Sequence, residues 1–444
     1  MIERRRLTLK TVRLRHARHY ENRLGEMNAV YRTAGADAAP ILRQFDREWP
    51  QIKAVHAWAA QQNTKSREVN ALCRNFPIAG ATLLDLRQNP REQIRWLKSA
   101  LDHAVDAPRQ KAVLSGKLGW AYHNLREYEN ALIEYRKAVR LSRRLGDKNN
   151  ETKLRGYLGS YYRDVGRYGR SIVCYRKALS LSREIGNTQW EGVHLGNLGN
   201  AYRQLGYYKI ALNYYVKALG IHRRQNDRRL EGIRLGNIGL AFIGLGKYKR
   251  AAVFLHAALD IADELSDDKN RLFNLGNLGT VHQRQGKFDE AIGYYDQALQ
   301  VAQKLGDRRY ESFWLGSKGR AYSYLHRNEE ALACYNAALK IAQEIGDRRY
   351  EGAHLASLGN HYLLTGEYDR AVKLLTEALK IAQKTGEKQA QAARLANLGA
   401  ACERLGQKEK ARKYYSEAKE IFATIEIEHG KQVAERQLVR LNRD

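Results

Sequence analysis

The stretch Leu195-Gly-Asn-Leu-Gly-Asn-Ala-Tyr202 returns in related form every 40 residues along the chain. Small residues also recur at two later columns of the same register, represented by Ala211 and Ala218. Eight copies in one register predict an array of like supersecondary units, each stacked on the next. The glycine that marks the register stands at Gly119, Gly159, Gly199, Gly239, Gly279, Gly319, Gly359 and Gly399.

Each copy has the pattern of two helices. The segment from Leu195 to about Leu205 carries apolar residues at helical spacing, and Gly206 predicts its end. A second amphipathic helix is predicted for about 209–224, followed by Asn226-Asp227. That dipeptide suits a left-handed closure of one helix and a cap for the next.

The repeated glycines predict close packing inside each helix pair. A glycine within a helix costs about 1 kcal/mol relative to alanine, so its return in every copy needs a compensating contact. We expect the missing side chain to let two helices approach each other, with the alanine columns serving the same end. One pair cannot bury its apolar face alone, so stacking of the pairs must complete the core.

These columns, with Tyr215 among them, resemble the tetratricopeptide repeat in its 40-residue form. That form occurs in spindle-orientation scaffolds, kinesin light chains and bacterial sensor proteins. The resemblance covers about residues 110 to 425. It implies an all-α fold, a right-handed superhelical solenoid of antiparallel helix pairs. The motif is specific to the fold and not to one function.

The sequence predicts four regions. They are a helical N-terminal extension (1–66), a degenerate helix pair (67–108), eight 40-residue repeats (109–425) and a C-terminal capping helix (426–444). In the last region, Ala434, Leu438 and Leu441 share one face, which is typical of a helix that closes a solenoid.

The N-terminal extension resembles a second known context. Its runs at 15–20 and 45–58 are similar to the segment that precedes the repeat sensor of STAND/NB-ARC-type signalling ATPases. The GxxxxGK[ST] phosphate-binding loop of such ATPases does not occur in the sequence. The resemblance therefore implies a sensor-like module without the nucleotide-binding half.

The charge balance favours acidic partners. The chain has 77 Lys and Arg against 48 Asp and Glu, a formal net charge of +29. Such a field attracts acidic protein segments, nucleic acid or an anionic membrane surface, although a solvated basic surface without a specific partner is the plain alternative. The basic start of the chain, including Arg4, Arg5 and Arg6, motivates the nucleic-acid reading.

Further features of the sequence limit the cellular location and the chemistry that the protein could carry out. The four cysteines form no CxxC pair, and neither a secretory signal nor a membrane-spanning run of apolar residues occurs, which predicts a cytoplasmic location. His16 and His19 lack a further ligand at metal spacing. No catalytic constellation stands out, so we predict a protein that is not an enzyme and needs no metal or cofactor.

The family resemblance implies that the first helix of each pair lines a concave groove. An asparagine side chain carries donors and an acceptor, and could pair with both edges of an extended peptide backbone. Arginines add charge-assisted bonds to carboxylates, and aromatic residues could anchor a side chain. The predicted groove residues are Asn197, Asn200, Asn237, Asn277, Asn360, Asn397, Arg163, Arg203, Arg284, Arg320, Arg404, Tyr157 and Trp120.

Three functions stay open at this point. The first is an adaptor or sensor that holds an extended, acidic protein segment in the groove. The second is a nucleic-acid-associated protein that uses its basic surface. The third is a regulatory subunit of a separate signalling or defence effector. For the asparagines, contacts inside the solenoid are the alternative to peptide binding.

Overall fold

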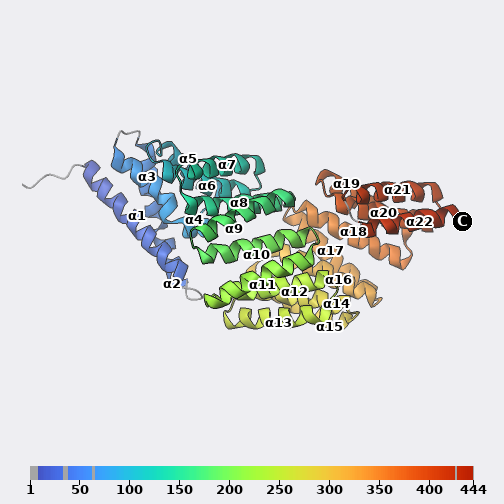
Figure 1. Ribbon diagram of the computed structural model, residues 1–444. Helices are drawn as coiled ribbons and strands as arrows, with labels where there is room; N and C mark the ends of the chain where they lie inside the picture. The colour runs from blue at the N-terminus through green and yellow to red at the C-terminus, as the bar shows by residue number, and fades with distance from the viewer. Residues whose placement is uncertain (1–8, 34–38, 63–65, 426–427, 444) are drawn as a thin grey trace, which may run out of the picture. The chain divides into compact units, whose positions relative to one another are not determined.

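The computed structural model describes residues 9–33, 39–62, 66–425 and 428–443, so the basic run Arg4–Arg6 lies outside the described residues. Over the described residues the chain has 22 helices and no strand (Figure 1). They are α1 (Leu9–Thr33), α2 (Ala39–Gln61), α3 (Arg67–Ala79), α4 (Ala81–Arg87), α5 (Pro90–Asp102), α6 (Pro108–Asn124), α7 (Tyr128–Arg144), α8 (Lys148–Asp164), α9 (Tyr168–Glu184), α10 (Thr188–Gln204), α11 (Tyr208–Arg224), α12 (Arg228–Gly244), α13 (Tyr248–Glu264), α14 (Asp268–Arg284), α15 (Phe288–Leu305), α16 (Arg308–Tyr324), α17 (Asn328–Glu344), α18 (Arg348–Thr365), α19 (Tyr368–Lys384), α20 (Lys388–Arg404), α21 (Lys408–Thr424) and α22 (Glu428–Arg443).

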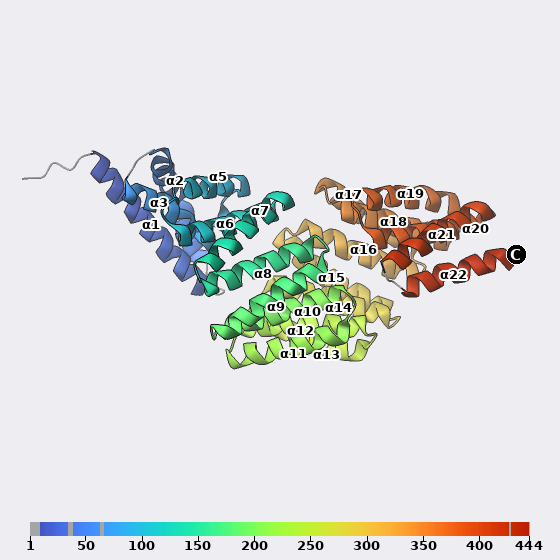
Figure 2. The same ribbon diagram turned by 45° about the horizontal axis from the view of Figure 1, so that its top comes forward.

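The chain divides into two compact units, Met1–Gly244 and Leu245–Asp444. Inside each unit, helices that follow one another in the sequence pack side by side, as α8 does with α9 and α20 with α21 (Figure 2). The predicted all-helical solenoid of paired repeats is therefore confirmed. None of the described helices combines the length and apolar character that crossing a bilayer requires.

The turns between helices follow the predicted chemistry. Gly206 adopts φ +80°, the left-handed conformation that glycine tolerates, and α10 ends just before it. Between pairs, Asn226 is left-handed at φ 53°, and the Asp227 carboxylate accepts a hydrogen bond from the Leu230 backbone N–H at 2.9 Å. Asn226-Asp227 thus closes α11 and caps α12 as expected.

The first helix of a pair begins earlier than the apolar pattern indicates. The sequence predicts a start near Leu195, whereas α10 begins at Thr188. The reason is local capping: the Asn187 side chain accepts a hydrogen bond from the Trp190 backbone N–H at 2.9 Å. The first turn has Trp190 as its single apolar residue among polar ones, so periodicity alone does not reveal it.

Most register glycines make room for the ring of a tyrosine from the second helix, and Gly359 makes room for Leu375 in the same way. A Cβ at Gly159 would lie 2.7 Å from Tyr175 Cε1, and one at Gly199 would lie 2.4 Å from Tyr215 Cε1. Both rings are fully buried. The expected close packing within the pair is confirmed, but the space left by the glycine is filled by a side chain of the second helix, which is a tyrosine in most copies.

A second glycine column, three residues earlier, joins one pair to the next. The first helix of the next pair fills the space above each of these glycines. The residue that does so stands 38 positions after the glycine, as His194 does for Gly156. His194 Cε1 would lie 2.8 Å from a Cβ at Gly156, and Trp314 Cζ2 would lie 2.0 Å from a Cβ at Gly276. Sequence periodicity does not show this contact, because the residue that fills the space varies. Its members are Leu114, Leu154, His194, Arg234, Asn274, Trp314, His354 and Arg394.

The two ends of the repeats are closed by apolar clusters. Residues 67–108, predicted as one degenerate pair, hold α3, α4 and α5 and the turn before α6. At the other end, Leu441 of α22 is 4% exposed and packs with Cys402 and Tyr415. α22 thus covers apolar side chains of α20 and α21 at the end of the last repeat.

The N-terminal helices α1 to α5 share a core of their own. Phe45, Phe76 and Trp96 are buried in it with leucines from α1, α3 and α4. The His56 ring stacks on Trp96 with centroids 3.6 Å apart, and its burial lowers the pKa of that imidazole to about 3. This core is continuous through α5 with the first repeat, because Leu97 packs in one cluster with Leu114 of α6.

Candidate functional site: the face of the first helices

Within each unit the first helices of successive pairs contact one another, as α6 contacts α8 and α16 contacts α18. The second helices of successive pairs approach each other less closely. A stack whose first helices are closer together curves around them. The first helices therefore lie on the inner side of each unit, and we call their solvent-facing surface the inner face.

The inner face of the first unit begins with a basic and aromatic cluster formed by Lys117, Trp120, Lys153 and Tyr157. The rings of Trp120 and Tyr157 lie 5.4 Å apart at an interplanar angle of 32°. The Lys153 ammonium lies over the Tyr157 ring, 5.9 Å from its centroid. This cluster joins both predicted aromatic anchors to two cations, and α6 and α8 position all four side chains.

Lys117 is the deepest cation of this cluster. Burial lowers the pKa of its ammonium to about 8; the Asp85 carboxylate opposes that shift and the neighbouring Lys153 adds to it. A cation in this position gains most from an anionic ligand, because partial desolvation strengthens the attraction between opposite charges.

The asparagine column is engaged differently along the inner face. Asn197 is partly exposed, whereas Asn237 and Asn277 are 9% and 8% exposed. The Asn277 side-chain N–H donates to the Phe273 carbonyl of its own helix at 2.7 Å. Asn237 is nearly buried and Asn277 is bonded within its own helix, so Asn197 is the best placed of the three to contact a ligand.

Three more predicted asparagines have partners inside the solenoid. Asn200 Oδ1 accepts a hydrogen bond from the Tyr215 hydroxyl at 2.8 Å, which anchors the ring beneath Gly199. The Asn397 side-chain N–H donates to Asn360 Oδ1 at 2.7 Å, joining α20 to α18. The alternative interpretation, contacts inside the solenoid, therefore holds in this structure for these side chains.

The predicted arginines fall into two groups. Arg163 pairs with the adjacent Asp164 at 2.9 Å. Arg203 lies near the buried Tyr215 hydroxyl: burial raises the pKa of that hydroxyl, and the charge of Arg203 partly opposes the rise. The Nε of Arg203 is buried and has no hydrogen-bond partner among the described residues. In the second unit the remaining predicted arginines are exposed: Arg284, Arg320 and Arg404.

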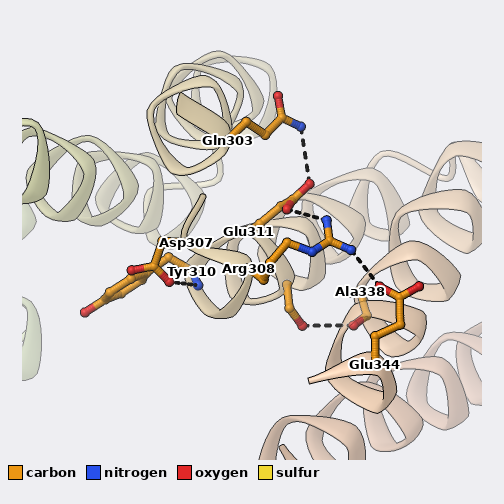
Figure 3. Close-up of polar contacts among 8 residues, drawn as sticks. Gln303, Asp307, Arg308, Tyr310, Glu311, Ala338 and Glu344 are labelled. Carbon is orange, nitrogen blue, oxygen red and sulfur yellow. Dashed lines mark hydrogen bonds and ion pairs between the residues drawn. The ribbon is translucent and has the colours of Figure 1, made fainter. Parts of the chain in front are cut away.

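The edge at the turns between pairs is also basic, but its charges are largely paired. Figure 3 shows Arg308 between Glu311 and Glu344, with both ion-pair distances at 2.7 Å. Asp307 caps α16 by accepting from the Tyr310 N–H at 3.1 Å. One pair further along, Arg348 pairs with Glu351 at 2.8 Å. This edge therefore offers a partner less unpaired charge than the inner face.

Lys117 and Lys153 were not among the predicted groove residues. Lys117 occupies the asparagine column in the first copy, so its position was visible, but its depth depends on how α6 packs. Lys153 lies one helical turn before Tyr157. In the sequence, a charged residue at this position suggests no more than a solvent-exposed helix surface. Among the described residues, no group of three or more His, Cys, Asp or Glu side chains is arranged to hold a metal ion.

Tetratricopeptide repeat models match residues 114–144, 150–224, 190–264, 270–344 and 350–424. The chain belongs to the tetratricopeptide repeat family. No curated protein is similar enough in sequence to count as a relative. Members of this family share the helix pair and its packing columns, and the partner differs from one member to another.

Solved structures share the fold at low sequence identity. The apo quorum sensor NprR from B. thuringiensis has a TM-score of 0.58 and 17% identity, over 79% of this chain and 97% of that one. A STAND ATPase with a tetratricopeptide repeat sensor, from Pyrococcus horikoshii, has a TM-score of 0.55 and 17% identity, over 84% of this chain and 55% of that one. A Rap conjugation gene regulator in complex with the Phr* peptide has a TM-score of 0.53 and 16% identity, over 82% and 97%. The chain is thus similar in fold to a STAND protein with a tetratricopeptide repeat sensor.

Proposed function

We propose that this tetratricopeptide repeat protein is a non-catalytic adaptor or sensor whose inner face holds an extended, acidic segment of another protein. The single observation that carries the proposal is the cluster of Lys117, Trp120, Lys153 and Tyr157. In it the Lys153 ammonium lies over one of two neighbouring aromatic rings, and the partly buried Lys117 lies within electrostatic reach of Lys153. A solved regulator of the same fold is in complex with a peptide, which supports this class of ligand.

The groove suits an extended segment because its polar groups form a row rather than a pocket. In the first unit, Lys117, Tyr157 and Asn197 occupy the same column of successive first helices. Arg203 lies further along α10 with a buried Nε that has no hydrogen-bond partner among the described residues. An acidic peptide that follows the row would meet a cation at each end and an amide between them.

A peptide array tests this proposal. Ten-residue peptides that vary in the number of acidic and apolar residues would be probed with the wild type and with Lys117→Gln/Arg203→Gln. We expect acidic peptides to bind the wild type, and the double variant to lose at least about tenfold in affinity, because it lacks two partly buried charged donors. Asn197→Ala is expected to reduce binding less, since it removes one neutral pair.

The matched control is Lys177→Gln/Lys217→Gln, which makes the same charge change on exposed positions of α9 and α11. It should bind like the wild type. Equal losses in both double variants would contradict a groove site and indicate attraction by net charge alone. Preferential retention of nuclease-sensitive nucleic acid over every acidic peptide would favour the nucleic-acid function instead.

Lys117 predicts that binding depends on pH. At pH 7 its ammonium is charged, and above a pKa of about 8 it becomes neutral. We therefore expect affinity for an acidic peptide to fall between pH 7 and pH 9, as measured by fluorescence anisotropy. Lys117→Arg should keep the affinity flat over this range, because arginine stays protonated. A wild-type affinity that stays flat would show that Lys117 does not contact the ligand.

A further inference from the structure

A cavity of about 200 Å³ lies among α18, α19 and α20 of the second unit. Its walls combine a small apolar surface with two arginines, one tyrosine and one glutamate. The lining residues are Arg349, Tyr350, Gly352, Ala353, Ala378, Ile381, Ala382, Glu387, Ala390 and Arg394.

The cavity exists because this copy departs from the other repeats at several columns. Where the structure has Ala390, two earlier copies have Asn150 and Asn270, and four have a large apolar residue: Trp190, Leu230, Tyr310 and Tyr350. Where it has Ala353, the two preceding copies have Phe273 and Phe313. One pair earlier, the rings of Phe313 and Tyr350 meet with centroids 5.8 Å apart and occupy the corresponding region. In the α18–α20 copy both rings are replaced by methyl groups.

Arg394 lines this cavity because the space that residues of its column fill in other copies is narrowed by a Cβ here. In neighbouring copies the same column packs over a glycine, as His354 does over Gly316. In this copy the residue beneath is Ala356, whose Cβ narrows that space. The Arg394 Nε is buried and has no hydrogen-bond partner among the described residues. Burial also lowers the pKa of Arg394, which the Glu387 carboxylate partly offsets.

The charges around the cavity sum to +1. Arg349 is paired with Glu387, which leaves the Arg394 guanidinium as the uncompensated charge. A buried guanidinium is satisfied by a planar carboxylate, which accepts two parallel hydrogen bonds. The apolar wall of Gly352, Ala378 and Ala382 suits a short branched hydrocarbon group, and the volume of about 200 Å³ limits the ligand to a small body.

We propose that this cavity binds a monocarboxylate with a short branched apolar body, whose carboxylate pairs with Arg394 and whose hydrocarbon contacts Gly352, Ala353 and Ala390. A free branched short-chain acid and the C-terminal residue of a polypeptide both present this chemistry. The site belongs to the second unit and shares no residue with the proposed peptide-binding cluster of Lys117, Trp120, Lys153 and Tyr157 in the first unit, so it is a second binding site of the chain.

Ligand-observed NMR and calorimetry with 4-methylpentanoate test the proposal. We expect a Kd in the millimolar range or below, which is roughly what so few non-hydrogen atoms allow. The uncharged 4-methylpentanamide should bind at least about tenfold more weakly. N-acetylleucine separates the two sources: tighter binding than 4-methylpentanoate indicates a polypeptide C-terminus, and weaker binding indicates a free acid.

Two variants remove the site in different ways. Ala390→Tyr restores the residue of Tyr310 and Tyr350 and should abolish binding by filling the cavity. Arg394→Gln should remove the preference for the acid over the amide. Gln389→Tyr adds the same bulk at an exposed neighbouring position and should bind like the wild type. Thermal unfolding checks that each variant is folded. Undiminished binding to folded Ala390→Tyr, or equal binding of acid and amide, would overturn the proposal.

Discussion

Replacement of Gly276 by alanine is expected to lower the free energy of unfolding of the second unit by about 2 kcal/mol or more. The added Cβ would lie 2.0 Å from Cζ2 of Trp314 and 2.2 Å from its Cε2, so the ring has to move. Trp314 is 2% exposed, and its ring packs against Tyr295 and Phe313 with centroids 5.8 and 4.6 Å away. A rigid ring held on both sides has no low-energy alternative position.

The same unit offers a matched control at Gly293, in the interior of α15. A Cβ there meets nothing within 4 Å, and the position is exposed. Alanine at this position should stabilise the unit by about 1 kcal/mol, because alanine is the better helix former. Denaturant unfolding of both variants should therefore show shifts of opposite sign. If Gly276→Ala were as stable as Gly293→Ala, the Trp314 contact would not constrain the stacking.

Acid is expected to destabilise the first unit by about 4 kcal/mol between pH 7 and pH 5, about 2 kcal/mol from each of two buried histidines. Burial lowers the pKa of His56 to about 3 and that of His194 to about 4. The unfolded chain takes up these protons near pH 6.5, whereas the folded unit does not. Stability is therefore fully present above pH 6.5 and falls as the pH drops toward the folded values.

His194→Leu separates this effect from general acid denaturation. Leu154 occupies the same column one copy earlier and is 2% exposed, so leucine suits the position. The variant should lose about 2 kcal/mol less than the wild type on going from pH 7 to pH 5, as seen by chemical denaturation at both values. His16→Gln, on an exposed side chain of α1, should behave like the wild type. An unchanged acid sensitivity in His194→Leu would show that its imidazole is protonated inside the folded unit.

On the inner face, the repeat pattern predicted which residues are equivalent but not how exposed each of them is. Periodicity identified Asn197 and Asn277 as equivalent, yet Asn277 turns back to its own helix at Phe273 while Asn197 stays partly exposed. Whether an amide faces solvent depends on how tightly the next first helix packs against it, and one column of letters does not contain that distance. For the same reason Lys117 appeared as one member of a column, although its surroundings make it the deepest cation of the inner-face cluster.

The sequence by itself determined the helix pairs, their turns and their stacking order. The reason is that left-handed Gly206, the cap at Asp227 and the buried alanines act within one or two neighbouring helices. Only the tertiary structure decided which residues fill the glycine spaces between pairs, which side chains reach the inner face, and that Ala353 and Ala390 leave a cavity beside Arg394. Those outcomes depend on the summed volume and charge of side chains from three helices, which no single repeat specifies.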